Sequence, residues 1–298
     1  MMNTKIIGWV GTGVMGKSMC KHIISKGYKV LVHNRTKSKT DDLIEAGATF
    51  ASFADVAKQS DYVFLMLGVP KDVEVHAFEK DGGLLSLMKP GSFLVDHTTS
   101  SPALAIRMAK EFKEKNIACY DAPVSGGDIG AKNGQLVTMC GGDKALFAEV
   151  EQIMACYSKK VQLMGEAGAG QNTKMTNQIA IASCMVGVCE ALIFAYKAGL
   201  NLEEVIQVIG GGAAASFSLS AYSPRILKGD YTPGFFVEHF VKDMDIALKE
   251  CEQMGITLPG LQLTRKLFEE LMAMEGGPKM GTQALIKVLE KLNNVTIR

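Results

Sequence analysis

The chain of 298 residues lacks an excess of charge of either sign. Its 32 Lys and Arg residues are balanced by 31 Asp and Glu residues, which gives a formal net charge of +1. No field of one sign is therefore available to attract nucleic acid or an anionic membrane. We predict neither as a partner and expect any anion site to be local.

Cysteine pairs are also missing. The seven cysteines are scattered, odd in number and without a CxxC spacing, which argues against a disulfide framework and against a zinc site. We expect them to be small buried side chains in a reducing compartment, and we predict no metal site. The chain begins Met-Met-Asn-Thr and enters a strand directly, which leaves no room for a signal peptide. A cytoplasmic location is expected.

Long apolar runs are nearly absent. Only residues 179–196 approach the length of a membrane span, and Glu190 lies inside this stretch while Lys197 follows it. Its small residues suit close helix packing. We therefore predict a buried central helix of a soluble protein.

A glycine-rich turn lies between a strand predicted at residues 5–10 and a helix predicted at residues 17–26. A strand, a glycine turn and a helix form the context in which GxGxxG indicates a dinucleotide site. Gly11 would make the turn, Gly13 would admit a pyrophosphate and Gly16 would allow close packing of helix on strand. The predicted cofactor contacts are Gly11, Thr12, Gly13, Val14, Met15 and Gly16.

The end of the next predicted strand, residues 29–33, bears on the choice of cofactor. NAD sites usually carry an acidic residue there, whereas this chain reads Asn34-Arg35-Thr36 with no carboxylate before Asp41. An Arg and a hydroxyl suit a 2′-phosphate. The alternative is a solvated basic helix start. We predict that NADP(H) is preferred and that NAD(H) is possible.

Strand and helix signals alternate up to about residue 164. Further strands are predicted at residues 62–67, 92–96, 117–121, 135–140 and 159–163, the last two at sheet edges, with helices at 102–116 and 144–155. This alternation predicts an α/β fold with a Rossmann, doubly wound, mainly parallel sheet, whose ligands bind beyond the carboxyl ends of the strands. Only helical periodicity follows, so we predict a Rossmann domain at 1–164 and an all-helical second domain at 165–298 that begins with the long helix.

Three stretches outside the glycine turn carry polar chemistry. In residues 121–127 a Ser-Gly-Gly run can direct a hydroxyl and backbone N–H groups to an anion, although such a stretch is often only a loop. Lys174 shares a helix face with Asn177 and Gln178, where a cation beside carboxamides can hold and protonate an oxygen. The alternative for Lys174 is a surface lysine near a helix start. In residues 234–248, Phe235 and Phe236 precede a helix that bears Lys242 and Asp243, which could equally be core aromatics and a surface ion pair.

Together these segments resemble the β-hydroxyacid dehydrogenases, the family of 3-hydroxyisobutyrate dehydrogenase and tartronate semialdehyde reductase. The resemblance is carried by residues 11–16, 96–102, 121–127, 168–178 and 242–243. It implies an NAD(P)-dependent oxidoreductase that interconverts a short 3- or 4-hydroxy acid and its semialdehyde. It also implies a helical domain that forms a homodimer or homotetramer. The Asn34-Arg35-Thr36 sequence is similar to that of the NADP-preferring glyoxylate and succinic semialdehyde reductases.

The resemblance also implies roles for single residues. Lys174 would be the general acid and base, aided by Asn177 and Gln178; many members have Asn four residues after the lysine, so which carboxamide orients the substrate stays open. Ser125, Gly126 and Gly127 would hold a substrate carboxylate, and we expect Phe235 and Phe236 to contact the substrate. Further cofactor contacts are implied at Leu67, Pro70, Thr99 and Lys242. Two alternatives are an imine reductase on the same fold, which usually lacks this lysine, and a non-catalytic NADP-binding module, which has no need of it.

Overall fold

The computed structural model describes residues 5–297 and divides the chain into two compact units. The first ends at Lys174 and the second begins at Met175. This division falls inside one long helix, whereas the sequence analysis places the domain boundary before that helix, at residue 164.

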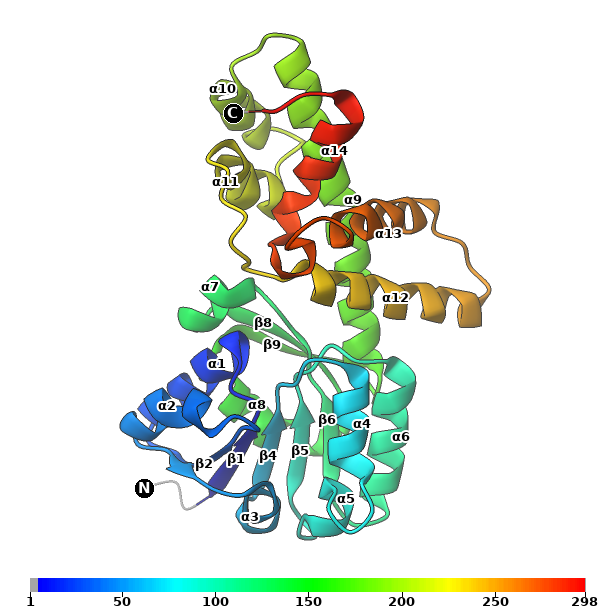
Figure 1. The fold of residues 1–298 in the computed structure, drawn as a ribbon. Helices are drawn as coiled ribbons and strands as arrows, with labels where there is room; N and C mark the ends of the chain where they lie inside the picture. Colours follow the sequence, from blue (N-terminus) through cyan, green and yellow to red (C-terminus); the bar gives the residue numbers. More distant parts are fainter. Residues whose placement is uncertain (1–4, 298) are drawn as a thin grey trace. The chain divides into compact units, whose positions relative to one another are not determined.

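The first unit contains a mainly parallel sheet (Figure 1). Its strands are ordered β3-β2-β1-β4-β5-β6-β8-β7, and β9 pairs with β8. The pairs among β1 to β6 are parallel, β8 runs antiparallel to β6 and β7, and β9 is parallel to β8. The strands are β1 (Ile6–Val10), β2 (Lys29–His33), β3 (Thr49–Phe50), β4 (Tyr62–Leu65), β5 (Phe93–Asp96), β6 (Ala118–Asp121), β7 (Val124–Ser125), β8 (Leu136–Gly141) and β9 (Ser158–Gly165).

Helices cover both faces of this sheet because successive strand residues point to opposite sides. Trp9 and Phe64 pack on one side with residues of α1, α7 and α8, while Val10 and Leu65 pack on the other with α3, α4, α5 and α6. The helices are α1 (Val14–Ser25), η1 (Lys37–Thr40), α2 (Asp41–Glu45), α3 (Phe53–Gln59), α4 (Pro70–Phe78), α5 (Leu84–Leu87), α6 (Pro102–Lys113), α7 (Gly127–Lys132), η2 (Lys144–Leu146) and α8 (Phe147–Met154). The doubly wound Rossmann fold is confirmed.

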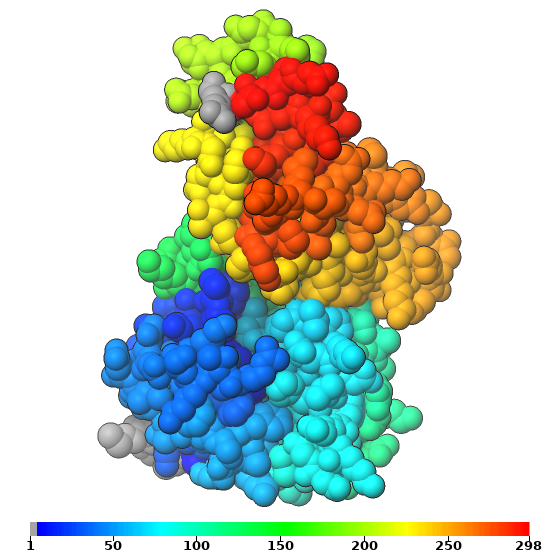
Figure 2. Space-filling view, viewed as in Figure 1, coloured from blue at the N-terminus to red at the C-terminus, as the bar shows by residue number. Residues whose placement is uncertain are grey.

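The second unit is helical and has a core of its own. Its helices are α9 (Ala169–Lys197), which begins in the first unit, α10 (Leu202–Gly210), η3 (Ser218–Tyr222), α11 (Ser223–Leu227), α12 (Val237–Met254), α13 (Pro259–Met272), η4 (Gly277–Lys279), η5 (Thr282–Leu285) and α14 (Ile286–Asn293). In the space-filling view, the visible surface of this unit is formed largely by the yellow to red segments, which hold α11 to α14 (Figure 2).

Two expectations need correction. Helix α9 is buried on one side only: Met185 and Leu192 lie in the core, whereas Phe194 is 74% exposed. Within residues 5–297, it is the one helix long and apolar enough to cross a membrane by length and composition alone. Strand β8 is not at the sheet edge, because it pairs with β6, β7 and β9.

Candidate functional site

The glycine turn between β1 and α1 depends on the absence of two side chains. Gly11 has a φ of +96°, and a Cβ atom on it would lie 2.3 Å from the carbonyl oxygen of Met66. A Cβ atom on Gly16 would lie 2.1 Å from the carbonyl oxygen of Gly11. Both distances are far below van der Waals contact, so these positions require glycine.

Gly13 has a different environment. No heavy atom lies within 4 Å of a Cβ built on it, so the turn opens into space at the N-cap of α1. The first turn of α1 carries no acidic residue, and no side chain caps it. Close by, the buried Thr12 hydroxyl is without a hydrogen-bond partner among the described residues. Unpaired donors at a helix N-terminus suit a phosphate. The turn therefore fits the pyrophosphate of a dinucleotide.

The end of β2 is joined to this turn through Asn34. Its Oδ1 accepts the backbone N–H of Thr12 at 3.1 Å, and its Nδ2 donates to the carbonyl of Thr36 at 3.0 Å. Asn34 thus supports the turn. The side chains of Arg35 and Thr36 are exposed. Asp42, farther along the chain, is paired with Lys17 at 2.9 Å. An anionic group bound beyond β2 would therefore be close to Arg35. Neither Asn34 nor Thr36 carries a carboxylate that would repel it.

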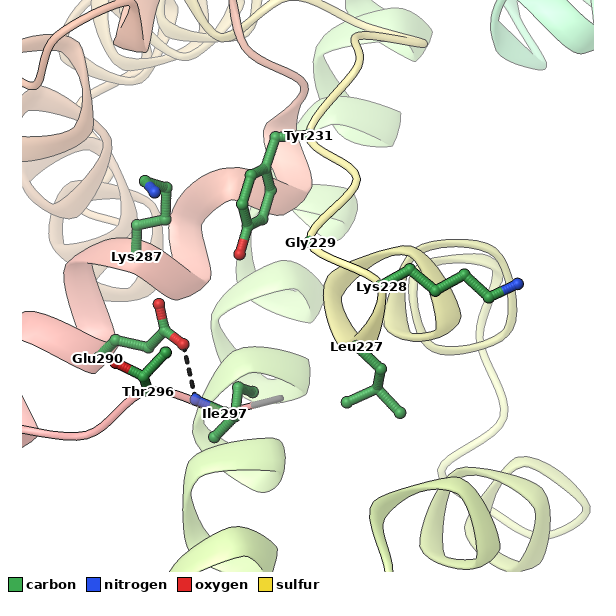
Figure 3. A pocket seen from close by; sticks show the side chains of 8 residues that line it. All are labelled: Leu227, Lys228, Gly229, Tyr231, Lys287, Glu290, Thr296 and Ile297. Carbon is green, nitrogen blue, oxygen red and sulfur yellow. Dashed lines mark hydrogen bonds between the residues drawn. The ribbon is translucent and has the colours of Figure 1, made fainter.

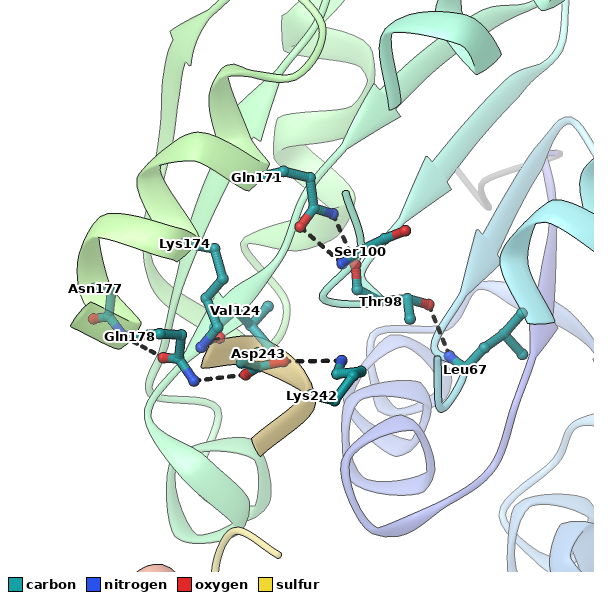
Figure 4. Close-up of polar contacts among 10 residues, drawn as sticks. All are labelled: Leu67, Thr98, Ser100, Val124, Gln171, Lys174, Asn177, Gln178, Lys242 and Asp243. Atoms are coloured by element: carbon teal, nitrogen blue, oxygen red, sulfur yellow. Dashed lines mark hydrogen bonds and ion pairs between the residues drawn. The ribbon is translucent and has the colours of Figure 1, made fainter. Parts of the chain in front are cut away.

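The loops after β4 and β5 are held together by Thr98. Its hydroxyl accepts the backbone N–H of Leu67 at 2.9 Å, and its own N–H donates to Asp96 Oδ1 at 2.9 Å. Thr99 follows in the same loop, and Pro70 begins α4 after the β4 loop. Leu67 and Thr98 therefore join the two loops (Figure 4). The predicted contact Thr99 is the next residue in the β5 loop.

Asp121, at the end of β6, binds the start of α9. Its two carboxylate oxygens accept the backbone N–H groups of Gly168 and Gln171, each at 2.7 Å. Burial raises the pKa of Asp121 to about 6, against the lowering effect of these N–H groups. This carboxylate satisfies donors that the start of a helix leaves unpaired.

The loop after Asp121 meets Lys174. The Nζ of Lys174 donates to the carbonyl of Val124 at 2.9 Å, and the residue is only 7% exposed. A surface lysine is therefore excluded. Ser125 follows in β7, and Gly126 and Gly127 have φ values of +126° and +64°. These left-handed conformations turn the chain sharply at the predicted carboxylate site.

In the second unit, two carboxamides and an ion pair form one chain of contacts (Figure 4). Asn177 Nδ2 donates to Gln178 Oε1 at 2.7 Å, and Gln178 Nε2 donates to Asp243 Oδ2 at 2.6 Å. Asp243 is 1% exposed and pairs with Lys242 Nζ at 2.9 Å. The interpretation of Lys242 and Asp243 as a surface ion pair is thus wrong.

Phe235 and Phe236 lie just before α12. The ring of Phe235 contacts that of Phe240, with 5.7 Å between centroids, and packs against the core of the second unit. The ring of Phe236 is 5.8 Å from that of His239. Both phenylalanines are half-buried, so part of each residue is exposed and can contact a ligand.

A cavity of about 280 Å³ in the second unit is lined by none of the predicted site residues (Figure 3). Two of its three charged side chains make contacts there: Glu290 accepts the backbone N–H of Ile297 at 2.8 Å, and Lys287 Nζ lies 5.0 Å from the ring centroid of Tyr231. Within residues 5–297, no cluster of three or more His, Cys, Asp or Glu side chains is arranged to hold a metal ion. The candidate site is therefore the set of loops around Gly11, Thr98, Val124 and Lys174.

Gln171 was not predicted from the sequence as a site residue, and Asp121 was placed in the polar stretch 121–127 without a role of its own. Gln171 is wholly buried, and its amide bonds to the backbone of Thr98 and Ser100. The available signal for Gln171 was its position in the first turn of the helix that carries Lys174, because a polar side chain on the buried side of a helix needs a partner.

Comparison with known proteins gives a consistent result over nearly the whole chain. Residues 6–165 match the model of the NAD-binding domain of 6-phosphogluconate dehydrogenase, and residues 168–289 match that of the NAD-binding domain of NADP-dependent 3-hydroxyisobutyrate dehydrogenase. The chain is 50% identical to a probable 3-hydroxyisobutyrate dehydrogenase-like protein of Arabidopsis thaliana, covering 99% of this chain and 88% of that protein.

Two further proteins are similar to nearly the whole chain at lower sequence identity. The 2-hydroxy-3-oxopropionate reductase of Escherichia coli is 34% identical, covering 97% of this chain and 98% of that protein. The fold is similar to that of the Mycobacterium tuberculosis 3-hydroxyisobutyrate dehydrogenase solved with L-serine, with a TM-score of 0.86 at 24% identity, covering 97% and 99% of the two chains.

Proposed function

Because the chain belongs to the β-hydroxyacid dehydrogenase family, we propose that it interconverts a short 3- or 4-hydroxy acid and its semialdehyde with NADP(H), using Lys174 as general acid and base. The observation that supports this role most directly is the burial of the Lys174 amine beside the Val124 carbonyl. A lysine kept from water in this way loses solvation and conformational freedom. We attribute this cost to a chemical role of the amine.

The nicotinamide ring supplies the hydride when the cofactor is bound. In the reducing direction, the Lys174 ammonium stabilises the developing alkoxide and donates a proton to it. In the oxidising direction, the neutral amine takes the hydroxyl proton. The Val124 carbonyl restrains the Nζ atom through its hydrogen bond, so the amine is held in one direction before the substrate arrives.

Carboxylate binding is assigned to the turn at Ser125, Gly126 and Gly127. The two glycines adopt left-handed φ values of +126° and +64°, and turns of this kind can form anion-binding concavities from successive backbone N–H groups. Backbone N–H groups and the Ser125 hydroxyl are donors that suit a carboxylate. A small acid held there presents its other end to Lys174, whose partner Val124 is the residue before Ser125.

Asn177 is the carboxamide that we assign to the substrate oxygen. Both ends of the Gln178 amide are engaged, with Asn177 at Oε1 and Asp243 at Nε2. Gln178 then positions Asn177, which follows Lys174 by three residues on α9. Phe235 and Phe236, at the start of α12, are assigned to the substrate side chain.

The residues after β2 support the proposed preference for NADP(H). Exposed Arg35 and Thr36 are suited to a 2′-phosphate. Asn34 supports the turn where an acidic residue would bind the ribose of NAD. Lys242, Leu67, Pro70 and Thr99 remain the other proposed cofactor contacts.

We assign self-association to the second unit, as a homodimer or homotetramer. Several large apolar side chains at the end of α9 and beyond it are exposed: Phe194, Tyr196, Leu200, Val208 and Phe217. Apolar surface of this kind is expected to be covered by a partner.

A cytoplasmic location is also part of the proposal. The seven free cysteines fit a reducing compartment such as the cytoplasm.

The test is a screen of NADPH oxidation over glyoxylate, succinic semialdehyde and tartronate semialdehyde, with 3-hydroxyisobutyrate and 4-hydroxybutyrate in the reverse direction. Lys174→Ala should lower kcat on the best substrate by roughly 10²–10⁴-fold, the usual contribution of a general acid. NADPH binding should be nearly unchanged.

Three results would contradict the proposal. A fully active Lys174→Ala variant would exclude the role of the amine. Turnover of a cyclic imine with none of a semialdehyde would favour an imine reductase, and NADPH binding without any turnover would favour a non-catalytic binding module.

A further inference from the structure

Gln171 contacts the backbone on both sides of Thr99. Its Oε1 accepts the N–H of Ser100 at 3.0 Å, and its Nε2 donates to the carbonyl of Thr98 at 2.8 Å (Figure 4). The orientation of the amide is determined, because the Ser100 N–H can only donate and the Thr98 carbonyl can only accept. The Gln171 amide thus satisfies two backbone groups of this loop, as the backbone of a neighbouring strand would in a sheet.

The helix end that carries Gln171 has little freedom to move. The backbone N–H of Gln171 donates to Asp121 Oδ2, and that of Gly168 donates to Oδ1, each at 2.7 Å. Gly170 packs so closely that a Cβ atom on it would lie 2.5 Å from the carbonyl oxygen of Met139. The first turn of α9 is therefore fixed to the end of β6 and packed against β8.

The loop on the other side of the Gln171 amide is fixed as well. The Thr98 hydroxyl accepts the N–H of Leu67, and the Thr98 N–H binds Asp96. Gln171 is consequently the side chain that joins the β4 and β5 loops to the helix of Lys174, which lies one turn farther on.

We propose that Gln171 is a positioning residue that sets the distance between the Lys174 amine and the Thr99 loop, and with it the alignment of substrate and nicotinamide. This inference rests on the proposed roles of Lys174 and Thr99. A shift of about 1 Å at a reacting centre can cost on the order of 10²-fold in rate. Loss of the Gln171 amide should therefore affect turnover more than cofactor binding.

Two substitutions separate positioning from simple stability. Gln171→Leu removes both hydrogen bonds at similar volume. Gln171→Glu keeps the shape and the acceptor for Ser100, but its carboxylate repels the Thr98 carbonyl until the acid is protonated and can donate. We expect both variants to lower kcat about 10- to 100-fold at neutral pH and to change the NADPH dissociation constant by less than about 3-fold. The Gln171→Glu rate, divided by the wild-type rate at each pH, should rise as the pH falls.

A primary isotope effect with NADPH deuterated at C4 gives an independent measurement. Misalignment makes the hydride step more limiting, so the isotope effect should increase in both variants. The control is Ser52→Ala, which removes the N-cap of α3 in the same unit. It should lower the melting temperature and leave kcat, the isotope effect and the pH dependence unchanged.

The inference fails if folded Gln171→Leu keeps kcat within about 2-fold of wild type, or if the Gln171→Glu ratio does not change with pH. Should Gln171→Leu not fold, the Gln171→Glu pH series decides alone. These outcomes are separable from failure of the proposed function, because an active Lys174→Ala variant overturns that function whatever Gln171 does.

Discussion

The Nε2 atom of His97 lies 2.8 Å from the hydroxyl of Tyr157, and both side chains are wholly buried. The Nδ1 atom of His97 lies 2.6 Å from the carbonyl of Ala122, which can only accept. Neutral His97 therefore carries its proton on Nδ1, and Nε2 accepts from Tyr157. The imidazole also stacks on Trp9, whose Nε1 donates to the carbonyl of Gly11. His97 thus supports the glycine turn indirectly, through its contact with Trp9.

Stability should fall below neutral pH because of this histidine. Burial lowers the pKa of His97 from 6.5 to about 4. Between these values the unfolded chain takes up a proton that the folded protein does not accept. The contribution of neutral His97 is therefore full above about pH 6.5 and is lost as the pH falls toward 4, with a total on the order of 3 kcal/mol.

The matched variant is His97→Gln, whose amide can replace both hydrogen bonds but does not titrate. Urea unfolding at pH 7.5 and pH 5.0, followed by the fluorescence of Trp9, the single tryptophan, would compare the two proteins. We expect wild type to lose on the order of 2 kcal/mol more than the variant between these pH values. Equal losses would show that His97 does not determine the acid sensitivity.

The fold could be predicted from the sequence wherever the signal is local. The strand, glycine turn and helix at the start of the chain are confirmed, with α1 beginning at Val14. The helical second half is confirmed in the same way, since its apolar periodicity is strong. Short elements such as β3 and α5 were missed because they span too few residues to show a period.

The site was less predictable because its contacts join distant segments. Lys174 was identified from its spacing to Asn177, but its partner Val124 lies 50 residues earlier. Gln171 and Thr98 are 73 residues apart. No pattern along the chain reports such pairings, and they follow only from the order of the strands in the sheet. The exposure of Phe194 was missed for the opposite reason, because an apolar residue in an apolar helix was assumed to be buried.

Gly13 and Gly16 should respond differently to alanine. Space is open around Gly13, so Gly13→Ala should fold with nearly normal stability and weaken NADPH binding by occupying the pyrophosphate position. Gly16→Ala places a Cβ against the Gly11 carbonyl and should lower the free energy of unfolding by about 1–3 kcal/mol, a usual cost of overpacking. Melting curves and fluorescence titration with NADPH would measure both effects. An equal loss of stability in the two variants would contradict the separate roles.

Arg35→Ser should reduce the preference for NADPH. A charge-assisted hydrogen bond is worth about 1.5–3 kcal/mol, so the KM for NADPH should rise roughly 10- to 100-fold. The KM for NADH should change little, because it lacks the 2′-phosphate. Lys39→Ser, on an exposed residue nearby, is the control. Wild-type enzyme that prefers NADH would refute the cofactor assignment itself.

The Gln178 and Asp243 pair offers the most specific test of how Asn177 is oriented. Gln178→Glu brings two carboxylates together at a contact that is now 2.6 Å, and Asp243→Asn removes the charged partner of Lys242. Each change should lower the free energy of unfolding by about 1–3 kcal/mol, the usual cost of leaving a buried polar group unsatisfied. Each should also reduce kcat, since Asn177 loses a fixed neighbour.

The double variant Gln178→Glu with Asp243→Asn exchanges donor and acceptor. The amide introduced at position 243 can then donate to the carboxylate introduced at position 178, which still accepts from Asn177 and keeps one negative charge in the group. We expect the double variant to be more stable than the sum of the single losses predicts, by about 0.5–3 kcal/mol. It should also recover part of kcat. Urea unfolding followed by far-ultraviolet circular dichroism gives the coupling energy. Strictly additive losses would mean that the two side chains do not act as a pair, and the assignment of Gln178 as the residue that positions Asn177 would have to be abandoned.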